Sequence, residues 1–286
     1  MTAWALTLIL AAEFIHATWN LLNKRASGHA TFTWLVSVLS VVIYTPVAAA
    51  LIFYWQAPID LTSIVFMAGS AVLHTAYFLL LNEGYRAGDL SLVYPLARGT
   101  GPLLSSVAAI LILGERPSAL ALAGGLLIVV GVLVLTASPR GLRAVSARKA
   151  IVYALITGTF IAAYTLWDKQ AVSQFAVAPI LLDWGANLGR TLLLTPFALC
   201  HWNQARNEWR THRLEAAGIA LLVPLSYILV LTAMRFTPVS YVAPAREISI
   251  LIGTVMGTRW LAEGDAARRL SAAGAMVLGL VGLAVG

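Results

Sequence analysis

The sequence has little charge and only one cysteine. Charged residues make up 11% of the 286 residues, whereas hydrophobic residues make up 60% and the mean hydropathy is +0.84. Because so little polar surface cannot cover a soluble globule, the composition predicts an integral membrane protein. Cys200 stands alone, which excludes an intrachain disulfide and a pair of redox-active cysteines.

Motifs of common enzyme classes are also missing. The sequence contains no HExxH, GxSxG or Walker A motif, and no set of Cys and His residues spaced for a metal. We therefore predict neither an enzyme nor an ATP-driven pump, and neither a cofactor nor a metal.

Long apolar runs, by contrast, are abundant. A helix of about 20 apolar residues crosses the hydrocarbon core of a bilayer, so the sequence predicts an all-α integral membrane protein with ten transmembrane helices. The predicted ranges are residues 2–22, 31–55, 62–82, 91–113, 118–137, 150–168, 178–201, 216–234, 240–261 and 270–286. The polar stretch at residues 201–217 is predicted to be a loop. The first run has no basic leader and no small-residue cleavage site, so we expect it to be a retained helix.

The net charge of +7 comes mainly from Lys and Arg in the connections between these helices. This distribution predicts membrane topology rather than a nucleic-acid partner. The odd-numbered connections contain Lys24, Arg25, Arg86, Arg140, Arg143, Arg148, Lys149, Arg206, Arg210, Arg213, Arg268 and Arg269, and the even-numbered ones contain Arg116, Lys169 and Arg235. The positive-inside rule then places the odd connections in the cytoplasm and both termini outside.

The chain repeats itself. Sliding the sequence along itself aligns "YRAGDLSLVYP" (85–95) with "MRFTPVSYVAP" (234–244), so that Pro95 falls on Pro244. Residues 1–138 and 150–286 are predicted to be two five-helix repeats, joined by a basic linker at 139–149. Because five is odd, the second repeat enters the membrane from the opposite side. Such inverted repeats are a common plan of secondary transporters.

Two motifs add to this arrangement: "HATWNLLNKRA" (16–26) in the first helix, and "LGER" (113–116) before a glycine-rich fifth helix. Together with the two five-helix repeats, they resemble the drug/metabolite transporter superfamily, specifically its EamA-like family, over nearly the whole chain. The resemblance implies transport of amino acids, other metabolites or toxic compounds, although some such families flip lipid-linked sugars. We expect a small-molecule substrate, a bacterial-type inner membrane and, as a possibility within this family, a homodimer.

The second repeat departs from the family pattern. Its "LAEG" has Gly264 where the first repeat has Arg116, and Ile161 stands where the first repeat has His16. We therefore expect the two repeats to play unequal roles.

Polar residues within the apolar helices are the candidate functional residues. In the first helix, Glu13, His16 and Asn20 share one face, with Trp19 beside them. A charge at bilayer depth costs about 3 kcal/mol or more, so this face is predicted to point into the bundle or a wet cavity. Glu13 and His16 either pair with each other or with a neighbouring helix, or take part in proton coupling.

Arginines follow prolines at equivalent places in both repeats. Arg98 follows Pro95, and Arg246 follows Pro244 with Glu247 beside it. A proline loosens a membrane helix and is tolerated best next to a cavity. The two guanidinium groups are candidate clamps for a carboxylate or phosphonate. The alternative is that Arg246 pairs with an acid, either Glu247 or one on another helix, while Arg98 extends to the membrane surface.

Other candidates lie on the remaining helices. In the seventh predicted helix, Asp183, Asn187 and Arg190 share a face, and Asp183 and Arg190 either line the path or neutralise one another. The aromatic candidates for the cavity lining are His74, Tyr77, Tyr94, Tyr164 and Tyr241. Glu115 and Glu263 end helices, so capping or a loop salt bridge is predicted for them. Small residues at 122–135 and 272–286 should let helices approach closely.

The candidate charges balance. Arg98, Arg190 and Arg246 match Glu13, Asp183 and Glu247, whereas an exporter of hydrophobic cations would need an acid without a matching arginine. This favours a zwitterion or small organic anion. We predict a secondary transporter that works by alternating access, with or without proton coupling, and the family resemblance implies export. A flippase for lipid-linked sugars and a hydrophobic-drug exporter are the alternatives.

Overall fold

The computed structural model describes residues 1–23, 30–87, 90–136, 147–257 and 266–286, and within these ranges it contains helices and no strand. The helices are α1 (Ala3–Asn23), α2 (Ala30–Phe53), α3 (Leu61–Ala87), α4 (Leu90–Ile112), α5 (Ala119–Thr136), α6 (Ala147–Ser173), α7 (Pro179–Cys200), α8 (Trp202–Met234), α9 (Val239–Ala245), α10 (Ile248–Gly257) and α11 (Ala266–Val285). Helices α1, α2, α3, α6 and α8 are long and apolar enough to cross a membrane. The prediction of an all-α membrane protein is confirmed.

Some predicted features lie outside the described residues. These are Lys24, Arg25, Arg140, Arg143, Glu263, Gly264 and residues 139–146 of the linker, together with the side chains of Tyr94, Arg268 and Arg269.

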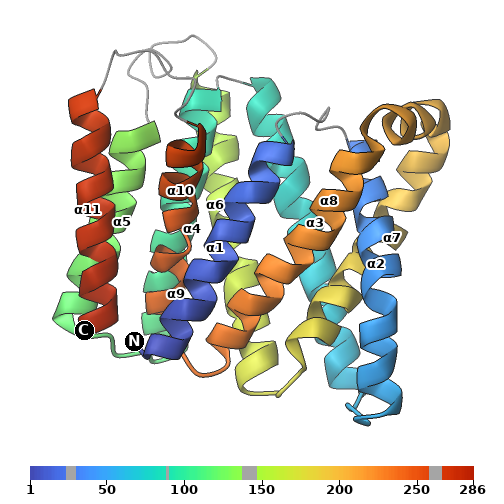
Figure 1. Cartoon of the computed structure of the whole chain (residues 1–286), viewed down its shortest axis with the longest axis horizontal. Helices are drawn as coiled ribbons and strands as arrows, with labels where there is room; N and C mark the ends of the chain where they lie inside the picture. The colour runs from blue at the N-terminus through green and yellow to red at the C-terminus, as the bar shows by residue number, and fades with distance from the viewer. Residues whose placement is uncertain (24–29, 88–89, 137–146, 258–265) are drawn as a thin grey trace.

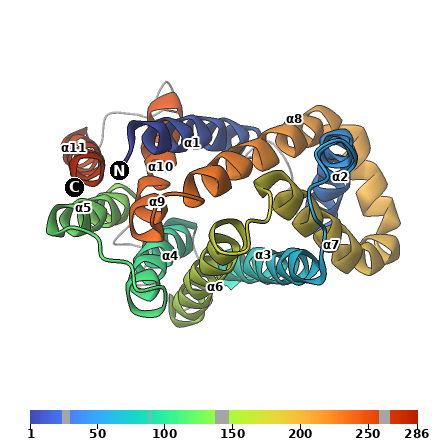
Figure 2. The same ribbon diagram turned by 90° about the horizontal axis from the view of Figure 1, so that it is seen from below.

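The helices stand side by side in an elongated bundle (Figure 1). Seen from below, α2 and α7 form one end of the bundle and α5 and α11 the other, while α9 and α10 lie between α1 and α4 (Figure 2). The amino group of Met1 donates hydrogen bonds to the carbonyl oxygens of Leu283 and Ala284, at 3.4 and 3.2 Å. Both chain ends therefore lie on one face of the bundle, called the terminal face below.

Serine and threonine are tolerated in these apolar helices because their hydroxyl groups hydrogen-bond to backbone carbonyl groups of the same helix. The hydroxyls of Thr75, Ser105 and Thr157 each donate to the backbone carbonyl four residues earlier, at 2.7 Å. Such a bond removes the need for water or a neighbouring helix as a partner.

Small residues bring α5 and α11 together, as the sequence predicted. A Cβ atom added at Gly124 would lie 2.5 Å from the carbonyl oxygen of Gly279, and one added at Gly279 would lie 2.5 Å from that of Gly124. Only glycine leaves room for two backbones at this separation. The small residues of these helices thus serve packing within the chain.

The prediction of a loop at residues 201–217 is wrong. Helix α8 begins at Trp202, and a non-helical residue, His212 (φ −125°, ψ 27°), separates its first turns from the rest. These first turns lie across the top of the bundle in Figure 1. Ala205 and Glu208 are buried while their neighbours are exposed. Only one face of such a polar helix packs against the protein. Its sequence therefore contains no long run of apolar residues, and hydropathy alone does not predict it.

Two other predicted helices differ from the observed ones. The helix predicted at 240–261 is broken into α9 and α10 at Arg246 and Glu247, because Pro244 cannot donate a backbone hydrogen bond. At the break, the amide of Glu247 donates to the carbonyl of Pro244, three residues back, at 3.0 Å. Helix α6 starts at Ala147 and ends at Ser173, so it extends beyond the predicted 150–168 at both ends.

Candidate functional site

Glu13 lies at the middle of the bundle. It is ten residues from the start of α1, which corresponds to about 15 Å of helix, or half the thickness of a bilayer core. Its residue surface is 1% exposed. One carboxylate oxygen, Oε1, lies 3.8 Å from Nε of Arg246, and the other, Oε2, is buried without a hydrogen-bond partner. The predicted inward orientation of this residue is confirmed.

Arg98 and Glu247 form a second ion pair beside the first. Nε of Arg98 lies 3.0 Å from Oε2 of Glu247, and the two side chains are 14% and 4% exposed. The guanidinium also donates to Oγ of Ser249 at 3.4 Å. Arg98 therefore does not extend to the membrane surface, so that part of the alternative is wrong, whereas its other part is confirmed because Arg246 pairs with an acid on another helix, Glu13. Helix α4 is held to the break between α9 and α10. We call Glu13, Arg98, Arg246 and Glu247 the arginine–carboxylate cluster.

The other polar candidates of α1 lie beside this cluster rather than in it. The rings of His16 and Trp19 meet edge to face, with centroids 4.7 Å apart. Trp19 packs against an apolar cluster that includes Phe32 and Ile219, and its Nε1 is buried without a hydrogen-bond partner. Asn20 is half-buried.

A second polar cluster surrounds Asp168 of α6, which is fully buried. The hydroxyl of Tyr227 donates to Oδ2 of Asp168 at 2.5 Å, and Nε2 of His74 lies 4.0 Å from the same oxygen. The His74 ring stacks on Tyr164, with centroids 4.0 Å apart, and Tyr77 contacts Tyr164 edge to face at 5.7 Å. We call these five residues the tyrosine–aspartate cluster. It brings together His74, Tyr77 and Tyr164 in ring contacts, and their predicted role in lining a cavity stays a prediction.

Asp168 and Tyr227 were missed by the sequence analysis. The predicted helix ended at residue 168, which placed Asp168 at the membrane surface. Helix α6 continues for five more residues, so Asp168 lies about 8 Å inside the helix end. The sequence did contain a signal for this. No residue that ends a helix follows Asp168 and Lys169 directly, so the helix could have been continued past them.

Tyr227 connects the two clusters. The guanidinium carbon of Arg246 lies 5.5 Å from the centroid of its ring, within the range of a cation–π contact. The hydroxyl of the same ring binds Asp168. A single tyrosine thus touches the cation of one cluster and the carboxylate of the other.

The three polar residues of α7 form a chain of contacts through an amide. Nδ2 of Asn187 donates to Oδ2 of Asp183 at 3.0 Å, and Nη1 of Arg190 donates to Oδ1 of Asn187 at 3.5 Å. Asn187 therefore links the acid to the arginine. Nε of Arg190 is buried without a hydrogen-bond partner.

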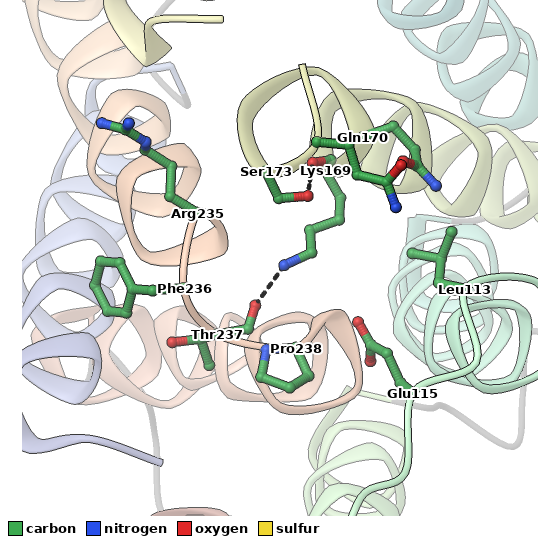
Figure 3. Close-up of a pocket in the computed structure, with 10 residues that line it drawn as sticks. Leu113, Glu115, Lys169, Gln170, Ser173, Arg235, Phe236, Thr237 and Pro238 are labelled. Carbon is green, nitrogen blue, oxygen red and sulfur yellow. Dashed lines mark hydrogen bonds between the residues drawn. The ribbon is translucent and has the colours of Figure 1, made fainter. Parts of the chain in front are cut away.

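A pocket of about 280 Å³ opens among the helix ends of the terminal face (Figure 3). It is lined by Leu113, Glu115, Lys169, Gln170, Ser173, Gln174, Arg235, Phe236, Thr237 and Pro238. Nζ of Lys169 donates to the carbonyl oxygens of Met234 and Thr237, at 2.6 and 3.0 Å, which ties the end of α6 to the segment between α8 and α9.

Glu115 caps a helix, as predicted, but the helix belongs to the other half of the chain. Its carboxylate accepts hydrogen bonds from the amides of Val239 and Ser240, at 2.7 and 2.9 Å, where α9 begins.

Tyr241 is not part of either cluster: its hydroxyl accepts from the amide of Ser118 and donates to the carbonyl of Gly286. It packs at the ends of α5 and α11 instead of lining a cavity.

Comparison with known proteins agrees with this architecture. Residues 3–137 match the model of the EamA-like transporter family. No curated protein matches the sequence. A solved structure described as "Crystal structure of protein" is similar over 100% of this chain and 98% of its own, with a TM-score of 0.81 and 16% sequence identity. At this identity the similarity establishes a shared fold.

Proposed function

Because residues 3–137 of this chain belong to the EamA-like transporter family, we propose that the protein is a secondary transporter of a bacterial-type inner membrane. It carries a small zwitterionic or anionic metabolite, such as an amino acid or a related compound, across the membrane by alternating access. The observation that carries this proposal is Arg246, a buried guanidinium at a helix break.

The packing of the helices supports two inverted repeats. The sequence repeat maps α1 to α5 onto α6, α7, α8, the α9–α10 pair and α11. If the two halves are related by this mapping, each contact between helices should have an equivalent contact. The contact between α1 and α8 is equivalent to that between α6 and α3, and the contact between α4 and α6 is equivalent to that between α10 and α1. The pairs α2–α7, α5–α11 and α4–α9 map onto themselves. A two-fold relation between the halves requires this pattern, and rocking of one repeat against the other is the motion proposed for transport.

Arg246 is the better placed of the two arginines to bind an anionic group. Its 3.8 Å separation from Glu13 is too long for a hydrogen bond, so its guanidinium can bind a carboxylate without first breaking a hydrogen bond to that acid. Arg98 lies 3.0 Å from Glu247, and this pair must loosen before the arginine can contribute. We therefore assign the first substrate contact to Arg246 and the second to Arg98.

The same exchange provides proton coupling. When a substrate carboxylate takes the place of Glu13 at Arg246, Glu13 is left as an unpaired buried acid. An ionised carboxylate without a partner is costly at bilayer depth, so Glu13 takes up a proton. His16, one turn along α1, is the proposed proton donor and acceptor for this step.

One observation favours a second candidate function. Asp168 is a buried acid with a tyrosine and a histidine beside it. A buried acid without a matching arginine is the feature expected of an exporter of hydrophobic cations.

Flux measurements in proteoliposomes test both candidates. The purified protein is supplied with labelled amino acids, organic phosphonates or cationic dyes, with and without an imposed proton gradient. The proposal expects flux of amino acids or phosphonates that the gradient accelerates and that falls sharply in Arg246→Ala and Arg98→Ala. Arg86→Ala is the matched control, because Arg86 is exposed and pairs with Glu83 on the same helix. Wild-type rates in correctly inserted Arg246→Ala and Arg98→Ala would overturn the assignment, and flux of dyes alone would favour the second candidate.

A further inference from the structure

Asp168 differs from the other acids buried among the membrane-spanning helices. Each of the others has an arginine beside it or one amide away, in the sets Glu13–Arg246, Glu247–Arg98 and Asp183–Asn187–Arg190. The near neighbours of the Asp168 carboxylate are instead the hydroxyls of Tyr227 and Ser70 and the imidazole of His74.

The buried charges are therefore unequal in number. The acids are Glu13, Asp168, Asp183 and Glu247, and the arginines of the same described helices are Arg98, Arg190 and Arg246. At the pocket, Lys169 and Glu115 add one charge of each sign, and Arg235 adds a positive charge that is exposed to water and lies outside the low-dielectric interior. With every acid ionised, one negative charge would remain without compensation in a low-dielectric interior, which is unfavourable. A single proton restores the balance, and Asp168 is the acid that lacks an arginine.

The geometry at Asp168 suits a proton. Oδ2 accepts the hydrogen bond from Tyr227 at 2.5 Å, while Oδ1 is buried and has no hydrogen-bond partner. Oδ1 is therefore the oxygen that can carry a hydrogen atom without displacing an existing bond. A proton also needs no cavity, so a fully buried carboxylate can bind one where it could not bind a larger ion.

Groups on each neighbouring element set the electrostatic surroundings of Asp168. Helix α3 contributes Ser70 and His74, α8 contributes Tyr227, α7 contributes Asp183, and the break after α9 contributes Arg246. Helix α6 itself contributes Tyr164, which Arg98 of α4 faces. Arg190 of α7 faces the rings of His74, Tyr164 and Tyr227 and is linked to Asp183 through Asn187. The charge of Arg98 is compensated locally by Glu247 and that of Arg246 by Glu13. The near neighbours of Asp168 are thus two hydroxyls, of Tyr227 and Ser70, and an imidazole that can be neutral.

The two residues that follow Asp168 on α6 lie at the pocket of the terminal face. Lys169 and Gln170, the next two residues of α6, line the pocket of the terminal face (Figure 3). Asp168 lies about 8 Å inside the end of α6, less deep than Glu13, which is near the middle of the bundle. Asp168 is therefore nearer to the level of the pocket than the arginine–carboxylate cluster is.

We propose that Asp168, with Tyr227 and His74, is a proton-binding site that exchanges its proton with water on the terminal face. In the loaded state an O–H bond forms at Oδ1, and Oδ2 still accepts from Tyr227. On release the O–H bond breaks, the carboxylate keeps the electron pair, and the proton passes to water in the pocket. The site is separate from Glu13 and His16. Only its link to transport rests on the proposed function.

Infrared spectroscopy of the full-length protein in lipid tests proton binding directly. As pH is raised, the wild-type protein should lose the carbonyl band of a protonated carboxylic acid. Asp168→Asn should lack this titrating band, Asp168→Glu should show it at a shifted frequency, and Tyr227→Phe should shift its titration midpoint. Glu208→Gln is the control, because Glu208 is a buried acid outside the spanning part of α8. A titrating band that persists unchanged in Asp168→Asn, or its absence from the wild-type spectrum, would overturn the proposal. The Glu and Phe variants keep the test valid if the Asn variant fails to fold.

Flux measurements then test the link to transport. With a transported substrate, Asp168→Asn should reduce the acceleration by a proton gradient to the part that Glu13 and His16 supply, whereas Glu208→Gln should keep it in full. A wild-type response in Asp168→Asn would overturn the link while leaving the proposed transport function standing. If the wild-type protein transported none of the labelled amino acids, phosphonates or dyes, that result would instead count against the proposed function. The infrared result would still decide whether Asp168 binds a proton.

Discussion

Burial, rather than distance, should decide how much an ion pair contributes to the stability of this protein. The chain offers a matched comparison. Arg98 and Glu247 lie 3.0 Å apart with side chains 14% and 4% exposed, whereas Arg86 and Glu83 lie 2.6 Å apart with side chains 72% and 46% exposed. The exposed pair is closer, yet water screens it.

The expected magnitudes follow from what each substitution leaves behind. Arg98→Met keeps most of the side-chain volume but leaves Glu247 as an unpaired buried acid, which should cost about 3–5 kcal/mol of unfolding free energy. This corresponds to roughly a hundred- to several-thousand-fold change in the folding equilibrium. Arg86→Met should cost less than about 1 kcal/mol, because an exposed pair contributes little. Replacing both buried partners, as in Arg98→Met with Glu247→Met, should recover most of the loss.

The assay is reversible unfolding of the purified protein in mild detergent by increasing amounts of SDS, followed through the fluorescence of its nine tryptophans. The reasoning would be refuted if Arg98→Met were as stable as the wild type, or if the double substitution were no more stable than the single one. A recovered double variant should still fail to transport, because its guanidinium is gone. That separates the role of the pair in stability from its proposed role at the substrate.

Three further perturbations test other contacts. Glu115→Gln weakens the charge-assisted capping of α9 and should cost about 1–2 kcal/mol in the same unfolding assay, so unchanged stability would contradict the observed cap. Gly124→Leu places a side chain against the backbone of Gly279 and should prevent α5 and α11 from packing, which limited proteolysis would detect as new cleavage between them; an unaltered digest would argue against the contact. Pro244→Ala restores a donor for the carbonyl of Ser240 and should favour one continuous helix over α9 and α10, giving higher stability but slower flux; equal flux would show that the break is not needed for transport.

Much of the fold could be predicted because membrane helices depend on local composition. Runs of about 20 apolar residues predicted α1, α2 and α3 to within a few residues, since lipid forces the backbone to satisfy its own hydrogen bonds. The first turns of α8 were missed because their stability comes from resting Ala205 and Glu208 on the rest of the protein, which leaves no apolar run to detect. The break at Arg246 followed Pro244, but whether a proline bends a helix or interrupts it depends on its neighbours.

The candidate site was harder to predict because its partners come from distant parts of the chain. The inward orientation of Glu13 followed from the cost of exposing a charge to lipid. Its pairing with Arg246, and that of Arg98 with Glu247, joins residues more than 140 positions apart, and no spacing within one helix reveals it. The buried charges seemed balanced for a different reason. The predicted helix ended at residue 168, so Asp168 was not counted among the buried acids, whereas α6 continues to Ser173.

The position of Tyr227 provides a physical route between the two proposed events. Arg246 lies over the face of its ring, and a nearby cation makes a phenolic O–H a stronger hydrogen-bond donor to Asp168. A substrate carboxylate that binds Arg246 partly neutralises this cation, so the hydrogen bond to the ionised carboxylate weakens and the protonated form of Asp168 gains in relative stability. Substrate binding at one cluster therefore promotes proton binding at the other without direct contact between them. Because linkage is reciprocal, a proton on Asp168 must favour substrate at Arg246 by the same factor. Tyr227→Phe keeps the ring below Arg246 but removes the hydroxyl, so it should leave substrate binding at high pH intact and reduce its enhancement at low pH to the part that protonation of Glu13 supplies.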